Sequence, residues 1–310
     1  MLSEEELETL DEIICHGNNA DFEKDYEEWI LEPLIPYESI VILDGLGGSG
    51  KSWFALDISY AISLDFKYLG RYPVKKPGHV LYVTAEEVPP RFLKRIDLVT
   101  ATYGDNENFH WFSTLHKKFR YGTSLLEKEG WMIVRTKTAD ALEYYMDKYR
   151  PTLIVLDSLI NFYGLNENDS SEAKKFYEML IGWIKTYQCS FLLLHHQNKE
   201  SMKSEEGIFR GSTVFREQAR ERITYKNVKL ENNMMVKKIS IEKANYYSPL
   251  LEEFPIYLRF DTGTHIYDEE LIDQIKREEE KKKSKSEKKS SKGEELKKKK
   301  EDKTEPLNLF

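Results

Sequence analysis

The chain has 310 residues, of which 40% are hydrophobic, which is enough for one large domain or two small ones with a sizeable core. It contains no apolar run of the eighteen or so residues that a membrane helix needs, and its first residues lack the basic start and apolar stretch of a signal peptide. The two cysteines, Cys15 and Cys189, have neither metal-ligand spacing nor a disulfide framework, so we expect a cytoplasmic protein without a membrane partner.

The net charge of −8 is unevenly distributed along the chain. Residues 276–310 hold fourteen Lys or Arg against nine Asp or Glu, so this tail is +5 and residues 1–275 carry −13. Such an acidic body argues against non-specific coating of DNA by the whole surface, because binding of that kind depends on neutralising phosphates. Any contact with nucleic acid must come from local loops, a pore or the tail.

The sequence pattern divides the chain into three parts. Residues 1–27 form an acidic segment whose apolar residues recur at roughly helical spacing, at Leu7, Leu10, Ile13 and Ile14. Residues 28–275 hold the apolar runs and glycine-rich turns of a folded domain. From Lys276 onward the chain is mostly Lys, Glu and Ser with almost nothing to bury, so we expect residues 276–310 to be a disordered tail.

Apolar runs alternate with helical patterns through the first two thirds of the central part. The runs, each followed by a polar or glycine-rich turn, are Ile40–Leu43, Val80–Val83, Phe109–Phe112, Leu153–Leu156 and Phe191–Leu194. Runs without polar alternation are typical of strands buried on both faces, as in a parallel sheet covered by helices. The helical patterns are Ser52–Leu64, Arg91–Thr102, Ala139–Tyr149 and Glu172–Tyr187. This order predicts an α/β fold that binds its ligands at the carboxyl ends of the strands.

After His196 the pattern changes. Residues 199–211 are polar and contain glycine, which predicts a long loop. The segments Arg222–Val228, Val236–Lys243 and Ile256–Phe260 then alternate between apolar and polar residues. That alternation predicts antiparallel strands toward the C-terminus of the domain.

One motif carries most of the chemistry. Residues 45–52 match G-x-x-x-x-G-K-[ST] in full, between a buried strand and a helical pattern. In such a P-loop the backbone N–H groups of the glycine-rich turn and the N-terminus of the helix bind phosphate. Lys51 would reach the β- and γ-phosphates of ATP, and the hydroxyl of Ser52 would bind Mg²⁺. The nucleotide-binding residues predicted from this motif are Gly45, Gly47, Gly48, Ser49, Gly50, Lys51 and Ser52.

Two strands that end in a carboxylate extend this site. The run Leu153–Leu156 ends in Asp157, which has the Walker B form and is expected to help hold Mg²⁺ beside the P-loop. The strand after the P-loop helix ends near Glu86 and Glu87, where a carboxylate would orient or deprotonate the attacking water. The alternative for this pair is a solvated start of a helix, where negative charge is favoured in any case.

His195 and His196 follow the last buried run. They could be a metal pair, a sensor of the γ-phosphate or packing at a strand end, although adjacent strand residues point to opposite faces and cannot easily bind one metal. The next residues, Asn198-Lys199-Glu200-Ser201, lack the Asp with which GTPases read guanine, and Asp157-Ser158-Leu159-Ile160 lacks the Gly of D-x-x-G. We therefore reject a GTPase.

Together these motifs resemble the RecA-like AAA_25 group, typified by plasmid RepA replicative helicases. The resemblance covers roughly residues 28–228. It rests on Glu28-Trp29-Ile30, Ile35-Pro36, the P-loop, residues 69–74, residues 78–87, residues 155–158, the His195-His196 pair with Lys199, and Phe209-Arg210-Gly211-Ser212. It implies a RecA-like P-loop NTPase core with a mostly parallel sheet flanked by helices.

The resemblance also implies an assembly and roles for single residues. It implies a hexameric ring with ATP between neighbouring subunits, in which Glu86 is the catalytic carboxylate and His196 the γ-phosphate sensor, with His195 as the alternative. Residues 199–211 correspond to a pore loop that touches nucleic acid. Arg220 corresponds to an arginine that reaches the neighbour's nucleotide, where it would stabilise charge on the transferred phosphoryl group. The alternative for Arg220 is a solvated arginine on a helix face.

The tail ends in a short apolar motif. Three of its four large apolar side chains are Leu307, Leu309 and Phe310, in the last four positions. Pro306–Phe310 resembles the bacterial sliding-clamp-binding peptide, except that Pro306 stands where that pattern has Gln. The alternative is a chance apolar end, since short motifs recur by accident.

The expected function is an ATP-hydrolysing motor that acts on single-stranded DNA in replication or recombination, most simply a ring helicase. A first alternative is a RadA-like or KaiC-like ATPase whose cycle drives assembly or regulation without unwinding. A second is a P-loop small-molecule kinase, which would need an arginine-rich lid that the sequence does not show. A non-catalytic adaptor conflicts with the intact set of Lys51, Ser52, Glu86 and Asp157.

Overall fold

A computed structural model describes residues 27–166, 169–197 and 214–275, together with the single residues 3, 5 and 277. Three segments singled out in the sequence lie outside the described residues. They are most of the acidic segment 1–27, the loop 199–211 with its lysines and Arg210, and nearly all of the tail 276–310 with Leu307, Leu309 and Phe310.

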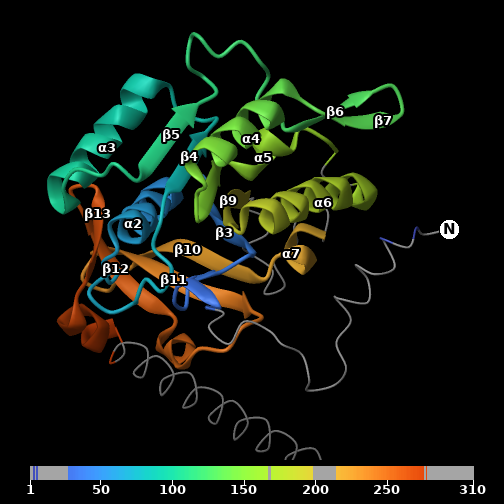
Figure 1. The fold of residues 1–310 in the computed structure, drawn as a ribbon. Helices are drawn as coiled ribbons and strands as arrows, with labels where there is room; N and C mark the ends of the chain where they lie inside the picture. The colour runs from blue at the N-terminus through green and yellow to red at the C-terminus, as the bar shows by residue number, and fades with distance from the viewer. Residues whose placement is uncertain are drawn as a thin grey trace, which may run out of the picture.

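A nine-stranded sheet forms the centre of the molecule (Figure 1). Its strand order is β13-β12-β11-β10-β3-β9-β8-β4-β5. The six strands from β10 to β5 run parallel: β10 (Glu221–Lys229), β3 (Ile40–Leu46), β9 (Ser190–Gln197), β8 (Leu153–Asp157), β4 (Val80–Thr84) and β5 (Phe109–Ser113). The other three are antiparallel: β11 (Met235–Ala244), β12 (Ile256–Asp261) and β13 (Thr264–Tyr267).

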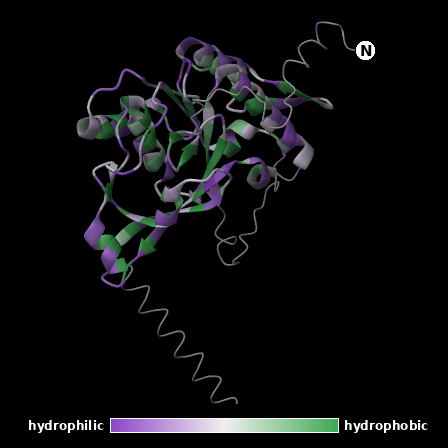
Figure 2. Cartoon of the chain, turned by 60° about the horizontal axis from the view of Figure 1, so that its bottom comes forward, coloured by the Kyte–Doolittle hydropathy of each residue, from purple (hydrophilic) through white to green (hydrophobic). Residues whose placement is uncertain are grey.

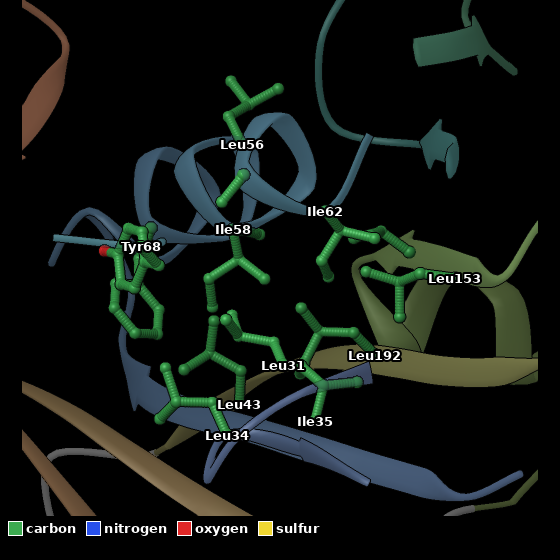
Figure 3. Packing of buried hydrophobic residues seen from close by; sticks show 14 of the residues in the cluster. Leu31, Leu34, Ile35, Leu43, Leu56, Ile58, Ile62, Tyr68, Leu153 and Leu192 are labelled. Carbon is green, nitrogen blue, oxygen red and sulfur yellow. The ribbon is translucent and has the colours of Figure 1, made fainter. Parts of the chain in front are cut away.

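The central parallel strands β3, β4 and β8 are mainly apolar along their length because helices cover both faces of the sheet there. Along β3, Val41 and Leu43 face one core cluster, whereas Ile40 and Ile42 face the other. The first face is covered by α2 (Lys51–Leu64) and α3 (Pro89–Tyr103). Figure 3 shows Ile58 of α2 pointing toward the sheet, on the side where Leu43 of β3 lies below it. In Figure 2 the apolar residues are concentrated on these central strands.

The second face is covered by α4 (Lys137–Tyr149), α5 (Leu159–Tyr163) and α6 (Ser170–Tyr187), and the short α7 (Val214–Gln218) packs beside α6. Local signals define the helix starts. The Thr136 side chain accepts a hydrogen bond from Ala139 N before α4, and Asp169 accepts from the backbone of Ser171 and Glu172 before α6. Such caps satisfy N–H groups that have no partner within the helix.

The predicted α/β fold with antiparallel strands near the C-terminus is confirmed, and all five apolar runs and four helical patterns form the expected elements. One prediction needs refinement. The strand predicted at Arg222–Val228 is antiparallel only toward β11, since its first residues pair in parallel with β3. It therefore joins the parallel part of the sheet to the antiparallel part.

Several short elements were not predicted. They are the hairpin of β1 (Trp29–Leu31) and β2 (Ile35–Pro36), the hairpin of β6 (Leu126–Glu129) and β7 (Met132–Arg135), the strand β13, the helices α5 and α7, and a 3-10 helix at Pro249–Glu253. Each is five residues or shorter, which is too few for a periodic pattern to stand out in the sequence.

Candidate active site

The glycine-rich loop joins the carboxyl end of β3 to the first turn of α2. Gly48 and Gly50 have φ angles of 71° and 109°, which glycine adopts without the steric cost of a side chain. A Cβ on Gly45 would lie 2.4 Å from the backbone oxygen of Tyr225, so that position requires a residue without a side chain. The loop thus presents backbone N–H groups and the positive end of α2 to one point, which is the arrangement that binds phosphate.

Lys51 folds over this loop. Its Nζ donates to the backbone oxygens of Gly45 at 2.9 Å and Leu46 at 3.0 Å, and the residue is almost fully buried. Burial lowers the pKa of Lys51, an effect opposed by the nearby carboxylates of Asp157, Glu86 and Asp44. The ammonium group therefore lies among three acidic side chains, at the place where the sequence predicts the phosphates.

His196 connects Lys51 to Glu86. Its Nδ1 lies 3.0 Å from Lys51 Nζ, and its Nε2 lies 2.8 Å from Glu86 Oε1. A lysine ammonium can only donate, so Nδ1 must accept from it, and Nε2 then carries the proton that is donated to the carboxylate. These three predicted residues, which come from α2, β9 and the end of β4, thus form one hydrogen-bonded chain.

The two adjacent glutamates have different surroundings. Hydrogen bonding from His196 is the largest influence on Glu86 and lowers its pKa, against the opposing effect of partial burial. Glu87 instead makes an ion pair with Arg95 of α3 at 2.5 Å. Of this pair, only Glu86 joins the hydrogen-bonded chain that reaches Lys51.

Asp157 ends β8 next to the start of α2. Its Oδ2 accepts a hydrogen bond of 2.8 Å from the Tyr82 hydroxyl, and it also interacts with the side chain of Ser52. Burial raises the pKa of Asp157, and the Ser52 hydrogen bond opposes that rise. A hydroxyl and a carboxylate are oxygen ligands of the kind Mg²⁺ prefers. Ser52 and Asp157 therefore fit an ion whose other ligands are water and phosphate, and the described residues contain no group of three or more His, Cys, Asp or Glu side chains arranged to hold a metal.

His195 lies on the opposite side of β9 from His196. Its Nδ1 is 2.8 Å from Asp44 Oδ1, and Arg222 Nε donates to the other oxygen of the same buried carboxylate at 2.5 Å. These contacts hold β9, β3 and β10 together beneath the loop. Of the two histidines, only His196 is placed beside Lys51 and Glu86.

Arg220 is far from the phosphate loop of its own chain. Its backbone N donates to the oxygen of Ile40 at the first residue of β3, whereas the P-loop follows the last residue of that strand. The exposed Arg220 lines a cavity of about 360 Å³ with Ile40, Ile184 and Glu217. Lys243 lies close enough for the charge of Arg220 to add to the lowering of its pKa by burial. Arg220 therefore lies outside the P-loop site of its own chain.

Two residues at the site had no signal in the sequence. The hydroxyl of Tyr82 positions Asp157, but the residue lies inside a uniformly apolar run. Lys237 comes from β11, far along the chain, and its Nζ donates to Ser49 O at 3.0 Å. Only the sheet topology brings Lys237 to the P-loop.

The sequence model of one family, AAA_25, described as an AAA domain, matches residues 4–202. The chain belongs to the AAA_25 family. It is therefore a P-loop ATPase, and the phosphate loop, Asp157 and both histidines fall inside the match, whereas Arg220 lies beyond it. No curated protein matches the chain. Among the residues described, no helix is long and apolar enough to cross a membrane.

Proposed function

We propose that this AAA_25 protein is an ATP-driven motor that acts on single-stranded DNA as a ring, most simply a hexameric helicase of the RepA-like kind. The observation that carries the proposal is the hydrogen-bonded chain Lys51–His196–Glu86. His196 contacts both Lys51 and Glu86, and it lies at the end of β9, three residues before the segment 199–211 that the sequence predicts to be a loop. Binding or loss of the γ-phosphate would therefore be passed to residues 199–211 through the side chain of His196.

The residues divide the chemistry as follows. Lys51 turns from the backbone oxygens of Gly45 and Leu46 toward the β- and γ-phosphates, and Glu86 orients and deprotonates the attacking water. Ser52 and Asp157 would hold Mg²⁺, which neutralises charge on the phosphates. His196 then loses or regains its bond to Lys51 as the γ-phosphate arrives and leaves.

The position of Arg220 supports action between copies. It stands at the opposite end of β3 from the P-loop, next to Lys243. In a head-to-tail arrangement one copy's P-loop faces the next copy's Arg220, and repeating this contact gives a ring when the rotation between copies closes. An arginine supplied in this way stabilises charge in the transition state and makes hydrolysis depend on assembly.

The test is ATP turnover by the full chain with and without single-stranded DNA or RNA, together with the mass of the assembly with nucleotide. Stimulation by single-stranded DNA, a ring of defined mass and displacement of a DNA strand would support the proposal. Turnover and ring formation without strand displacement would favour a regulatory or assembly ATPase. Transfer of phosphate to a small molecule would instead indicate a kinase.

A further inference from the structure

The segment between β5 and α4 contains a basic loop and a projecting hairpin that the ATP chemistry does not use. Residues 115–123 follow the carboxyl end of β5 and include Lys117, Lys118 and Arg120, all exposed. None of the ion pairs found among the described residues involves these three cations. Tyr121 is 54% exposed and touches Phe119 edge-on, with ring centroids 5.4 Å apart. Cations and aromatic rings thus alternate along one exposed loop.

The hairpin of β6 and β7 presents a tryptophan to solvent. Trp131 is 92% exposed and lies at the turn beside Gly130, whose φ is 63°. Figure 1 shows the hairpin standing clear of the helices at the edge of the molecule. The side chains of Glu127, Glu129 and Met132 beside it are also exposed, so the tip carries one aromatic ring with an apolar neighbour and two carboxylates nearby. Such a ring can offer its flat face to a nucleic-acid base.

Two ion pairs join the hairpin to the helices α6 and α4. Lys128 pairs with the buried Glu172 at the start of α6, and Arg135 pairs with Glu143 of α4. The charges of these two basic residues are therefore already compensated by carboxylates. The cations that remain for a ligand are Lys117, Lys118 and Arg120 of the loop. They give this part of an otherwise acidic protein a local positive charge.

Both ends of the segment contact the strands and helices of the ATP site. At its start, Ser113 Oγ donates to the backbone oxygen of Glu87 at 2.6 Å, next to Glu86. At the base of the hairpin, Leu125 N donates to Phe162 O of α5 at 2.8 Å. The helix α5 begins two residues after Asp157. A ligand bound to the segment would therefore act on backbone next to Glu86 at one end and close to Asp157 at the other.

We propose that residues 115–131 form a binding surface for single-stranded nucleic acid, distinct from the loop 199–211. Lys117, Lys118 and Arg120 bind the backbone phosphates, and Tyr121 and Trp131 stack on bases. This inference rests on the proposed function, since it supplies that motor with a second contact to its strand. Alternation of unpaired cations with exposed rings favours nucleic acid over a second protein copy, which would need a continuous apolar patch.

The experiment compares variants of the full chain for binding of a labelled single-stranded DNA across a salt series. Trp131→Ala should weaken binding about tenfold, whereas Trp131→Phe should largely keep it, because stacking needs a ring. The Lys117→Ala, Lys118→Ala, Arg120→Ala triple variant should reduce the slope of log affinity against log salt by about 2. Tyr247→Ala, which removes another ring that is 75% exposed on a separate loop, is the control and should change neither value.

The fluorescence of Trp131 gives an independent measurement, obtained as the difference between the wild type and Trp131→Phe. Its quenching on addition of DNA supports stacking. The surface is overturned if the wild type binds DNA, the variants bind with the same affinity and salt slope, and DNA does not quench the Trp131 signal. That result leaves the proposed function standing. A change in assembly mass with Trp131→Ala, without a change in DNA affinity, overturns it in favour of contact between copies. Absence of any nucleic-acid binding by the wild type overturns the proposed function as well.

Discussion

The imidazole of His196 donates from Nε2 to Glu86 across 2.8 Å, and this bond is the strongest influence that lowers the pKa of the Glu86 carboxyl. A base with a lowered pKa stays ionised at lower pH, so the wild type keeps its base as the medium becomes acidic. The same histidine accepts from Lys51 at 3.0 Å. Through these two hydrogen bonds, His196 links Lys51 of the P-loop to the carboxylate of Glu86.

His196→Ala should lower kcat by about tenfold or more, because a hydrogen bond to a charged group contributes about 1.5–3 kcal/mol. The acid limb of kcat/KM should also move to higher pH. Removing the donor raises the pKa of Glu86, and the base is then lost earlier as the pH falls. The measurement is a pH series of steady-state turnover for both proteins. An unchanged acid limb would show that His196 does not tune this carboxyl.

Glu86→Gln should bind ATP and fail to hydrolyse it, since the amide keeps the shape of the side chain but cannot take a proton. The matched variant is Glu87→Gln, which removes the ion pair with Arg95 and leaves the Lys51–His196–Glu86 chain intact. It should therefore turn over at a rate similar to the wild type. Single-turnover hydrolysis and nucleotide binding, measured on both variants, separate the two roles. The reverse result would mean that Glu87 is the base.

Arg220→Ala and Lys51→Ala should each abolish turnover alone and recover part of it when mixed. In a mixed ring some sites join an intact P-loop to an intact Arg220 from the next copy. The expected recovery follows from the position of Arg220 beside Ile40, at the far end of β3 from its own P-loop. Subunit exchange is checked by mass. Full exchange without any recovered turnover would exclude Arg220 as a residue that acts between copies.

The sequence predicted the sheet and the local motifs because both depend on short-range pattern. The run Ile40–Leu43 is apolar on both faces of β3, and the spacing of Gly45, Gly50 and Lys51 is set by the turn that binds phosphate. The short hairpin of β6 and β7 was not predicted, since neither of its four-residue strands alternates clearly and its turn carries Trp131.

Short-range patterns could not predict contacts between strands that lie far apart in the sequence. Neither Lys237 nor Tyr82 carries a motif, and each reaches the site only through strand order. The choice between His195 and His196 was likewise open in the sequence, because both follow the same run. The register of β9 against β3 sets His195 opposite Asp44, and His196 is the histidine that lies beside Lys51.

Glu221 offers a test of the fold that is independent of nucleotide. Its side chain is fully buried at the start of β10, and neither carboxylate oxygen has a hydrogen-bond partner among the described residues. Burial raises the pKa of Glu221 well above its usual range, so the folded protein keeps it protonated where the unfolded chain ionises it. Stability from this group is therefore complete below the unfolded pKa and is lost as the pH rises toward the folded pKa.

Glu221→Gln should remove that loss, because the amide stays neutral and has nearly the same shape. At pH 4 the variant and the wild type should have similar free energies of unfolding. Above about pH 5 the variant should become the more stable, by up to about 1.4 kcal/mol for each further pH unit until the folded pKa is reached. Urea denaturation from pH 4 to pH 7, without nucleotide, measures the difference. Glu217→Gln, at an exposed position on α7, is the control and should follow the wild type throughout. If the curves for Glu221→Gln and the wild type stay parallel, the carboxyl is charged in the folded protein and has a counterion.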